Sequence, residues 1–269
     1  MDSSGEHIRL RGVTKVFARG QSALRALGPV DLDIARGEFF SVVGPSGCGK
    51  STLLDVLSGL APASAGTASF DGQPLTGSVP DGIGAVFQQD ASFFWLNVWD
   101  NVAFGLRRQG QSATEIKRRV ADALAFMGLA EFAKAYPAQL SGGMRQRVCI
   151  ARTLVLEPRV LLLDEPFGAL DQQTRLLMDD ELLRVWRATG ATVILITHAL
   201  DEAAMLSDRV GVMSARPGRF IDIVTTDWPR GRDSRIVSDD RFGKITARLW
   251  SELREESLRS MGAPHPAIA

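Results

Sequence analysis

The segment Gly44–Thr52 places the strongest restriction on what this 269-residue chain can fold into. It reads GPSGCGKST and fits the pattern G-x-x-x-x-G-K-[ST] at every specified position. The apolar run Phe39–Val43 precedes it, and the mostly apolar segment Leu53–Leu57 follows it. We therefore predict a strand, a phosphate-binding loop (P loop) and the first turn of a helix.

Each specified residue of this loop has a physical role in holding phosphate. Gly44, Gly47 and Gly49 let the backbone curl so that successive N–H groups point at one anion. The helix that opens near Lys50 adds free N–H groups and its positive dipole end. Lys50 supplies a cation for the β- and γ-phosphates, and Ser51 supplies a hydroxyl for Mg²⁺. A chance glycine turn is the alternative, but the flanking strand and helix favour a site for a nucleoside triphosphate.

Two adjacent carboxylates, Asp164 and Glu165, follow the short apolar run Val160–Leu163. Such a run is typical of a parallel strand buried on both faces, and carboxylates at its end are costly to bury without a cation. Asp164 is therefore a candidate ligand of Mg²⁺, and Glu165 is a candidate base that orients and deprotonates an attacking water. A solvated strand end before a turn at Pro166 is the alternative.

A second candidate anion site begins at Ser141, in the segment Leu140–Arg147, which reads LSGGMRQR. Ser141 is a good N-cap, and an apolar stripe with helical spacing follows it. Gly142 and Gly143 allow a phosphate to approach the backbone closely. This helix start could serve the same nucleotide or a nucleotide held by another copy of the chain, and composition does not choose between them.

The segment Leu140–Met144 resembles the signature motif of ATP-binding-cassette (ABC) ATPases. Other elements of that family follow in the right order. Phe17 resembles the aromatic residue that stacks on adenine, Gln88 the Q-loop glutamine, and His198 the switch histidine. Ala169–Asp171 resembles the D-loop, in which Asp171 would lie at a dimer interface.

Within that family, the chain is most similar to the ATPase subunits of nitrate, sulfonate and taurine importers. The match runs from about Ile8 to Phe220, and three segments carry it: VWDNVAFGL at 98–106, YPAQLSGGMRQRVCIAR at 136–152 and LSDRVGVMSARPGR at 206–219. The chain departs from the usual pattern at Phe94, where a proline is common, and at Ala199, where an aspartate often follows the histidine.

The resemblance implies an α/β fold: a P-loop NTPase core with a mostly parallel sheet, an N-terminal antiparallel β subdomain and a helical signature subdomain. Strands that alternate with helices from Val160 to Thr197 indicate the same parallel sheet, and short alternating stretches in Ile8–Ile34 indicate antiparallel strands. The core would comprise residues 1–90 and 156–228, the helical subdomain 91–155, and a C-terminal helical tail 229–269. In the tail, Arg235–Leu258 is predicted to form one or two amphipathic helices that pack against the body, and Gly262–Ala269 to be disordered.

The resemblance also implies the residues that act on ATP. Glu165, His198 and Gln88 would be catalytic, and Ser51, Gln88 and Asp164 would hold Mg²⁺. The residues implied to bind ATP are Phe17, Gly44, Pro45, Ser46, Gly47, Cys48, Gly49, Lys50, Ser51, Thr52, Ser141, Gly142, Gly143 and Asp171. Two copies would close head to tail, each ATP lying between one P loop and the other copy's Ser141–Gly143.

Some of these residues have a purely structural alternative. Phe17 could belong to the core, Asp171 could only cap a helix, and a lone histidine after a strand, such as His198, is often structural. Cys48 lies beside Lys50 and a helix N-terminus, which stabilise a thiolate, so it is either a reactive thiol or a small residue that fills space.

Composition agrees with a transport ATPase that works through partners. Lys plus Arg and Asp plus Glu both number 31, so no basic field recruits nucleic acid. No apolar stretch approaches the roughly 20 residues needed to cross a bilayer, and the N-terminus has no signal peptide. The two cysteines have no metal-ligand spacing and suggest a reducing compartment. We expect a peripheral protein on the cytoplasmic face of the membrane, with transmembrane permease subunits and, indirectly, a periplasmic or extracellular solute-binding protein as partners.

Two other functions remain as alternatives. A soluble ABC ATPase that acts on nucleic acid or ribosomes usually needs two cassettes or a long coiled-coil insertion, and neither fits this chain. A non-hydrolysing ATP sensor is disfavoured because Glu165 and His198 are both present.

The segment Phe93–Trp99 contains four aromatic residues in seven, without helical or alternating order. An apolar surface of this kind predicts a contact site, because aromatic side chains are favoured interface anchors. In the importers that the chain resembles, the segment after the Q-loop glutamine receives a short coupling helix of the permease. A loop folded onto its own core is the alternative.

Overall fold

The computed structural model describes residues 6–19, 22–87, 91–168 and 170–262. Its centre is a six-stranded sheet in the order β10-β9-β3-β8-β7-β6, in which β10 alone runs antiparallel to its neighbour. The strands are β3 (Phe39–Val43), β6 (Ile83–Val86), β7 (Val160–Asp164), β8 (Thr192–Ile196), β9 (Arg209–Met213) and β10 (Phe220–Thr225). This sheet confirms the predicted α/β class.

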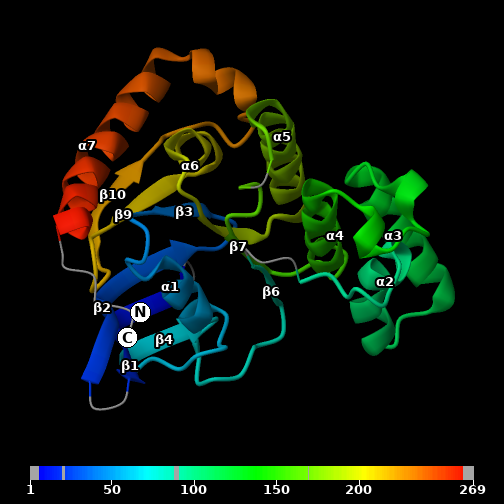
Figure 1. Ribbon diagram of the computed structural model, residues 1–269, viewed down its shortest axis with the longest axis horizontal. Coiled ribbons are helices and arrows are strands. Elements are labelled where there is room, and N and C mark those ends of the chain that lie inside the picture. Colours follow the sequence, from blue (N-terminus) through cyan, green and yellow to red (C-terminus); the bar gives the residue numbers. More distant parts are fainter. Residues whose placement is uncertain (1–5, 20–21, 88–90, 169, 263–269) are drawn as a thin grey trace.

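A second sheet, antiparallel throughout and ordered β2-β1-β4-β5, lies beneath the first in Figure 1. It consists of β1 (Glu6–Arg19), β2 (Ser22–Ala35), β4 (Ala65–Phe70) and β5 (Gln73–Pro74). The antiparallel strands predicted for the N-terminal region are thus confirmed, as two long strands that form one hairpin. Helix α1 (Lys50–Leu57) contacts both β2 and β7 and so fills the space between the two sheets.

The central strands are apolar throughout because both faces of the sheet are covered. Alternate side chains of a strand point to opposite faces, so β3 contributes Phe39 and Val43 to one core and Phe40 and Val42 to the other. The first core lies against α5 (Gln172–Thr189) and α6 (Leu200–Leu206), and the second lies against α1 and the antiparallel sheet. Both cores therefore fix the position of the loop that leaves β3.

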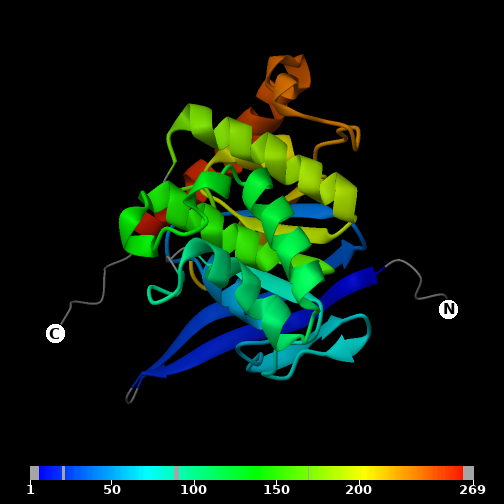
Figure 2. The same cartoon turned by 90° about the vertical axis from the view of Figure 1, so that its right-hand side faces the viewer.

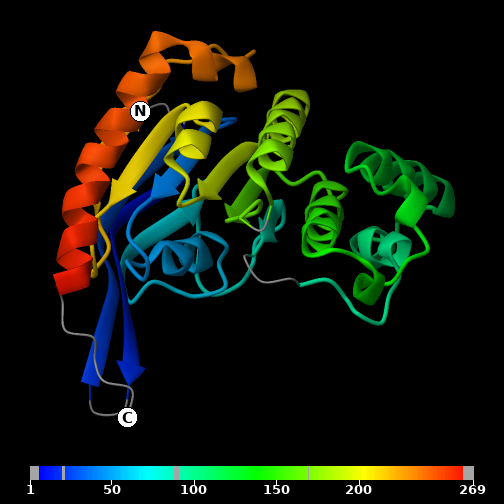
Figure 3. The ribbon, with the colours of Figure 1, turned by 45° about the horizontal axis from the view of Figure 1, so that its top comes forward.

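A group of helices lies beyond the β6 edge of the sheet, as Figures 1 and 3 show. It contains α2 (Val98–Arg108), α3 (Ala113–Phe126), α4 (Gly142–Leu154) and the short 3₁₀ turns Ala130–Phe132 and Pro137–Gln139. Figure 2 views this group from the front, with the β1–β2 hairpin extending away below it. Side-chain caps from Asn97, Ser112 and Ser141 start the three α-helices. The helix predicted after Ser141 and the helical pattern predicted from Ala113 are confirmed.

The C-terminal tail forms a 3₁₀ turn, Ser234–Ser238, and the long helix α7 (Asp240–Gly262), as predicted. Leu249 is fully buried where α7 packs against the body, and Arg248 forms an ion pair with Asp222 of β10 at 2.7 Å. Gly262, predicted to begin the disordered end, is instead the last residue of α7. Residues 263–269, also predicted to be disordered, lie outside the described residues. In the described part of the chain, every helix is too short or too polar to span a bilayer.

Candidate nucleotide site

The carboxyl ends of β3, β7 and β8 bring the P loop and two of the predicted catalytic residues, Glu165 and His198, to one end of the parallel strands. β3 leads into the P loop, β7 ends at Asp164, and β8 ends just before Thr197 and His198. The three strands are parallel neighbours, so these ends lie side by side. Ligands of α/β proteins bind at such an edge.

The P loop has the curled backbone that a phosphate cradle requires. Gly47 and Gly49 have φ angles of 71° and 117°, in a region that favours glycine. Lys50 is almost buried, and its Nζ donates to the carbonyl oxygens of Gly44 and Pro45 at 2.8 and 3.0 Å. Its ammonium group therefore bends back over the loop that precedes it, where it can meet a phosphate.

Asp164 lies beneath this loop and is 6% exposed. Burial raises the pKa of its carboxyl group, while a hydrogen bond from the Ser51 side chain lowers it. A buried carboxylate and a hydroxyl in contact with each other are the hard oxygen donors that Mg²⁺ prefers. The predicted ligands Asp164 and Ser51 thus fit that metal, and Gln88, the third, lies outside the described residues.

Glu165 and His198 face each other across the ends of β7 and β8. The His198 Nδ1 and Glu165 Oε2 atoms are 3.3 Å apart, and the Glu165 N–H donates to the carbonyl of Ile196 at 2.9 Å. Glu165 has a φ of 47°, which is uncommon for a residue with a side chain. Strained backbone of this kind gathers at functional sites, and here it directs the carboxylate toward the histidine.

Phe17 and Cys48 each had two interpretations, and the structure favours one for each. The Phe17 ring is 42% exposed, with Lys15 Nζ 5.4 Å from its centroid, so it does not belong to the core and is free to stack on a base. Cys48 is 1% exposed, and burial raises the pKa of its thiol. It fills space in the loop, and the reactive-thiolate interpretation loses its basis.

The Ser141 helix start lies in the helical group, beyond the β6 edge from the P loop. Ser141 caps α4 by accepting from the Met144 N–H at 3.3 Å, and both Ser141 and Gly142 are exposed. A Cβ atom on Gly143 would lie 2.4 Å from Cδ2 of Leu170, so this helix start packs closely against the predicted D-loop. An exposed helix start in this position is available to a second molecule.

Asp171 does cap a helix. It accepts from the N–H and the hydroxyl of Thr174 at 2.9 and 2.7 Å and starts α5. Both bonds lower the pKa of the Asp171 carboxyl group, and the bond from the Thr174 backbone has the larger effect. The capping role is compatible with a position of Asp171 at a dimer interface, which stays a prediction. Ala169 of the same loop lies outside the described residues.

Two groups of residues around this site were not predicted from the sequence. Arg216 donates to the P-loop carbonyl of Gly47, and a buried acidic pair, Asp179 and Glu202, lies behind His198. Glu202 accepts a bond from the side chain of Thr197, the residue before that histidine. Glu202 could have been noticed as a carboxylate beside an apolar run. The contact of Arg216 could not be predicted from neighbouring residues, because its partner Gly47 is 169 residues away.

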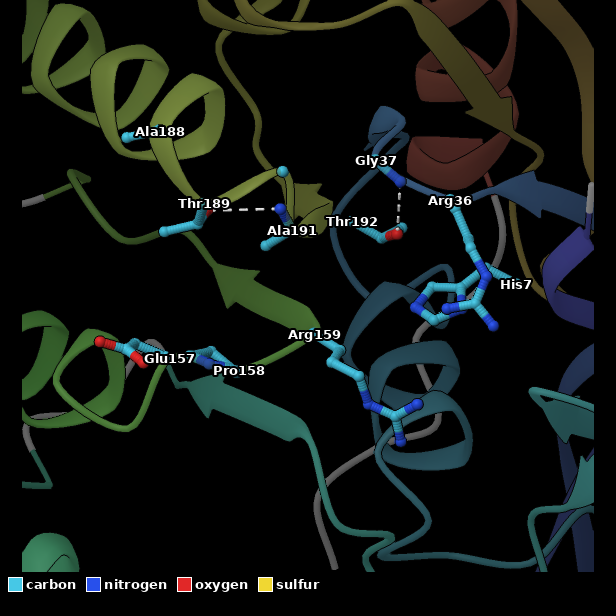
Figure 4. Close-up of a pocket in the computed structure, with 11 residues that line it drawn as sticks. His7, Arg36, Gly37, Glu157, Pro158, Arg159, Ala188, Thr189, Ala191 and Thr192 are labelled. Carbon is cyan, nitrogen blue, oxygen red and sulfur yellow. Dashed lines mark hydrogen bonds between the residues drawn. The ribbon is translucent and has the colours of Figure 1, made fainter.

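Two cavities are prominent in the described part of the molecule, and one of them borders the P loop. One of about 1020 Å³ begins at Ser46 and Gly47 of the P loop and extends past Leu24 to Glu256 in α7. The other, of about 450 Å³, lies at the opposite, amino-terminal ends of the parallel strands and is shown in Figure 4. Gly37, Arg159 and Thr192 line it, and each lies at or before the start of a strand, so this second cavity is separate from the predicted nucleotide site.

The polar groups around the second cavity are already paired. Gly37 N donates to Thr192 Oγ1 at 2.9 Å, as the dashed line in Figure 4 shows. Asp71 accepts from His7 at 2.7 Å and also pairs with Arg36 and Arg159. Burial lowers the pKa of His7. These groups join the two sheets.

Comparison with known proteins identifies the family. A family model described as "ABC transporter" matches residues 27–168. The taurine import ATP-binding protein of Burkholderia pseudomallei is 45% identical over 250 residues, which are 91% of this chain and 96% of that protein. The chain belongs to the ABC transporter family. It is accordingly an ATPase built on an ATP-binding cassette.

Other ABC proteins agree with this identification. The nitrate import ATP-binding protein of a Synechocystis species is 41% identical, and the alignment covers 92% of this chain and 95% of that protein. Among solved structures, a dimeric ATP-binding cassette in a post-hydrolysis state with ADP and Pi has a TM-score of 0.76 and 32% identity. That similarity covers 82% of this chain and 100% of the cassette.

Proposed function

We propose that this chain is the ATP-hydrolysing subunit of an importer for a small solute of the nitrate, sulfonate or taurine kind. The observation that carries the proposal is the convergence of Lys50, Asp164 and the Glu165–His198 pair at one sheet edge. The similarity to import proteins for taurine and nitrate, at 45% and 41% identity, supports the direction of transport. Which solute is carried would be decided by the partner proteins.

In the proposed mechanism, the P loop and Lys50 hold the β- and γ-phosphates of ATP. Ser51 and Asp164 would hold Mg²⁺, together with Gln88, and the metal would neutralise charge on the phosphates when bound. Glu165 would orient the attacking water and take its proton. His198, 3.3 Å from Glu165, would contact the γ-phosphate and fix the position of that carboxylate.

Closure of two copies would complete the site. The exposed Ser141–Gly143 helix start would present its free N–H groups to the ATP held on the other copy's P loop. The dimeric state of the similar cassette supports this arrangement. The proposed division into a nucleotide-binding core, 1–90 and 156–228, and a helical signature subdomain, 91–155, follows from the same scheme.

The proposed contact with a permease subunit is the aromatic segment before α2. Phe94 and Trp95 are 76% and 59% exposed, with their ring centroids 4.7 Å apart. The sequence prediction of an irregular segment is wrong at Val98 and Trp99, which form the first turn of α2 because Asn97 caps that helix. The exposed aromatic pair at Phe94 and Trp95 agrees with the predicted contact site.

A buried asparagine gives this segment a fixed shape. Asn101 is fully buried, and its Nδ2 donates to the carbonyls of Phe93, Leu96 and Asn97 at 3.1, 2.9 and 3.0 Å. Its Oδ1 accepts from the Phe93 N–H at 2.8 Å. The backbone that carries the exposed rings is therefore held in place before any partner arrives, which lowers the entropy lost on binding.

Membrane recruitment tests the proposal. The chain with Phe94→Ala and Trp95→Ala should lose transport and co-sedimentation with permease-containing vesicles while its basal phosphate release stays largely intact. Trp250→Ala removes an aromatic ring that is 57% exposed on α7 and serves as the matched control. The proposed contact is wrong if the double variant transports normally or if the control loses as much. Binding of the wild-type chain to ribosomes or nucleic acid instead of vesicles would favour the soluble alternative.

A further inference from the structure

The loop Ser214–Arg219, which joins β9 to β10, lies directly against the P loop. A Cβ atom on Gly218 would be 2.3 Å from the carbonyl oxygen of Cys48, so the loop approaches as closely as glycine permits. Gly218 N donates to Ala26 O, and Gly28 N donates to Gly218 O, both at 2.9 Å, which ties the loop to β2. Two elements distant in sequence thus support one side of the phosphate cradle.

Arg216 of this loop binds the P-loop backbone through its side chain. Its Nε and Nη2 atoms donate to the carbonyl oxygen of Gly47 at 2.9 and 2.7 Å. In a trans peptide the carbonyl and the next N–H point in opposite directions. By holding the Gly47 carbonyl, Arg216 therefore also sets the direction of the Cys48 N–H.

That N–H points into the P loop. Cys48 N donates to the carbonyl of Pro45 at 3.3 Å, and the same oxygen accepts from Lys50 Nζ at 3.0 Å. If this peptide flipped, the Gly47 carbonyl would face the phosphates, and its partial negative charge would repel them. The bond from Arg216 opposes the flip.

Helix α7 holds the loop that carries Arg216. Glu256 is 4% exposed, and its Oε2 accepts from the Ala215 N–H at 2.7 Å. Arg259, one turn further along α7, pairs with the other carboxylate oxygen. Figure 1 shows this end of α7 beside the turn between β9 and β10. The tail is thereby linked to the P loop through two adjacent residues, Ala215 and Arg216.

We propose that Arg216 is a positioning residue for ATP binding, and that α7 keeps it in place through Glu256. The proposal rests on the assignment of Gly44–Thr52 as the ATP loop. Arg216 acts on the direction of one P-loop peptide and takes no part in hydrolysis. It should therefore affect the affinity for nucleotide and leave the turnover rate at saturating ATP nearly unchanged.

Calorimetric titration of the full-length chain with MgADP tests this role. Arg216→Ala should weaken binding about fivefold to tenfold, since one charged but exposed hydrogen-bond donor is lost. Arg216→Lys should recover part of the affinity, because an ammonium group donates to the same oxygen without the guanidinium fork. Glu256→Ala should weaken binding about twofold to threefold, because the loop is then less firmly held.

Arg219→Ala, on the same loop, is the matched control and should bind MgADP as the wild-type chain does. KM for ATP should rise in Arg216→Ala while kcat and the melting temperature without nucleotide stay near the wild-type values. Equal affinity of Arg216→Ala and the wild type, or an equal loss in Arg219→Ala, would overturn the inference. A fall in kcat and melting temperature without rescue by lysine would overturn it as well. Failure of the wild-type chain itself to bind MgADP would contradict the ATP site rather than the role of Arg216.

Discussion

Glu165 shows how this chain orients a reactive group at the scale of one residue. Its left-handed backbone, with φ at 47°, costs on the order of 1–3 kcal/mol. The bond from its N–H to the Ile196 carbonyl helps to keep that conformation and aims the carboxylate at His198. The neighbouring Asp164 points into a buried site with Ser51. Two adjacent carboxylates thus have different surroundings, in agreement with the separate roles proposed for them.

Replacing Glu165 by glutamine should separate binding from hydrolysis. The amide keeps the shape of the side chain but is a very weak base, so we expect phosphate release to fall by about 100-fold or more. MgATP should still bind, whereas Lys50→Ala should weaken binding itself, because the cation over the loop is lost. Phosphate release and nucleotide titration measure the two effects. Turnover of Glu165→Gln near the wild-type rate would remove Glu165 from the mechanism.

The buried pair Asp179 and Glu202 makes stability depend on pH. Burial raises the pKa of Asp179 to about 9, and the nearby charge of Glu202 is the second cause of this rise. The charge of Arg175 lowers the pKa of Asp179, and the charge of Asp180 raises it. Burial also raises the pKa of Glu202, which Arg175 and His198 oppose. In the unfolded chain an aspartate has a pKa of about 3.9. Between these values the folded state holds a proton that the unfolded state has released, so stability falls as pH rises.

We therefore expect the free energy of unfolding to decrease between pH 6 and 9, by up to about 1.4 kcal/mol per pH unit for one proton. Asp179→Asn should make this decrease shallower, since an amide does not titrate. Urea unfolding at several pH values measures the slope. Asp201→Asn, on the exposed side of α6, is the control and should keep the wild-type slope. Equal slopes for the Asp179 and Asp201 variants would contradict the assignment.

At the scale of the elements, α7 joins the tail to the body over most of its length. Phe242, Leu249 and Leu253 are buried along one face, with exposures of 7%, 0% and 9%. Trp228, just before the tail, donates through Nε1 to the carbonyl of Ala204 at 2.7 Å. The helix is thus part of the folded domain, and its apolar stripe accounts for its place on the sheet.

Leu249→Ala should lower the free energy of unfolding by about 2–4 kcal/mol, because it leaves a cavity in a fully packed position. The exposed neighbour Trp250 provides a comparison on the same helix, and Trp250→Ala should change stability by less than about 0.5 kcal/mol. Chemical denaturation of both variants measures the difference. Similar values would show that α7 is not docked through this face.

The elements that sequence predicts well here are those fixed by local patterns. The P loop, the strand before Asp164 and the Ser141 cap each need only a dozen residues, and the structure shows each of them. Arg216 could not be predicted, because its role depends on Gly47 being brought to it across 169 residues. Asp179 looked like any acidic residue on a charged helix, and only packing against α6 buries it. Gln88, which was predicted, lies outside the described residues.

At the scale of the whole molecule, the two segments proposed to bind one ATP between two copies lie in different parts of a single chain. The P loop lies at the carboxyl end of the central strand β3, and Ser141–Gly143 lies in the helical group beyond β6. The proposed head-to-tail pair explains why both surfaces are exposed. It also predicts that the association of two chains depends on ATP.

Glu165→Gln should form a dimer in MgATP that light scattering detects as a doubled molar mass. Adding Ser141→Arg should keep it monomeric, because a bulky cation at the α4 start would occupy the place of the partner's phosphates. Glu165→Gln with Lys50→Ala is the control for nucleotide dependence and should also stay monomeric. A dimer that persists with Ser141→Arg would refute the head-to-tail arrangement.

The position of β3 in the sheet has a consequence for biosynthesis. Phe39 pairs with Val193 on one side, and Phe40 pairs with Arg209 on the other. At about 5–20 residues per second, a ribosome needs roughly ten to thirty seconds to complete those neighbours after β3 has been translated. During that interval the nascent chain carries an apolar strand with unsatisfied edges. The strand that leads into the P loop is thus translated early and paired late, which makes the growing chain a natural client for chaperones.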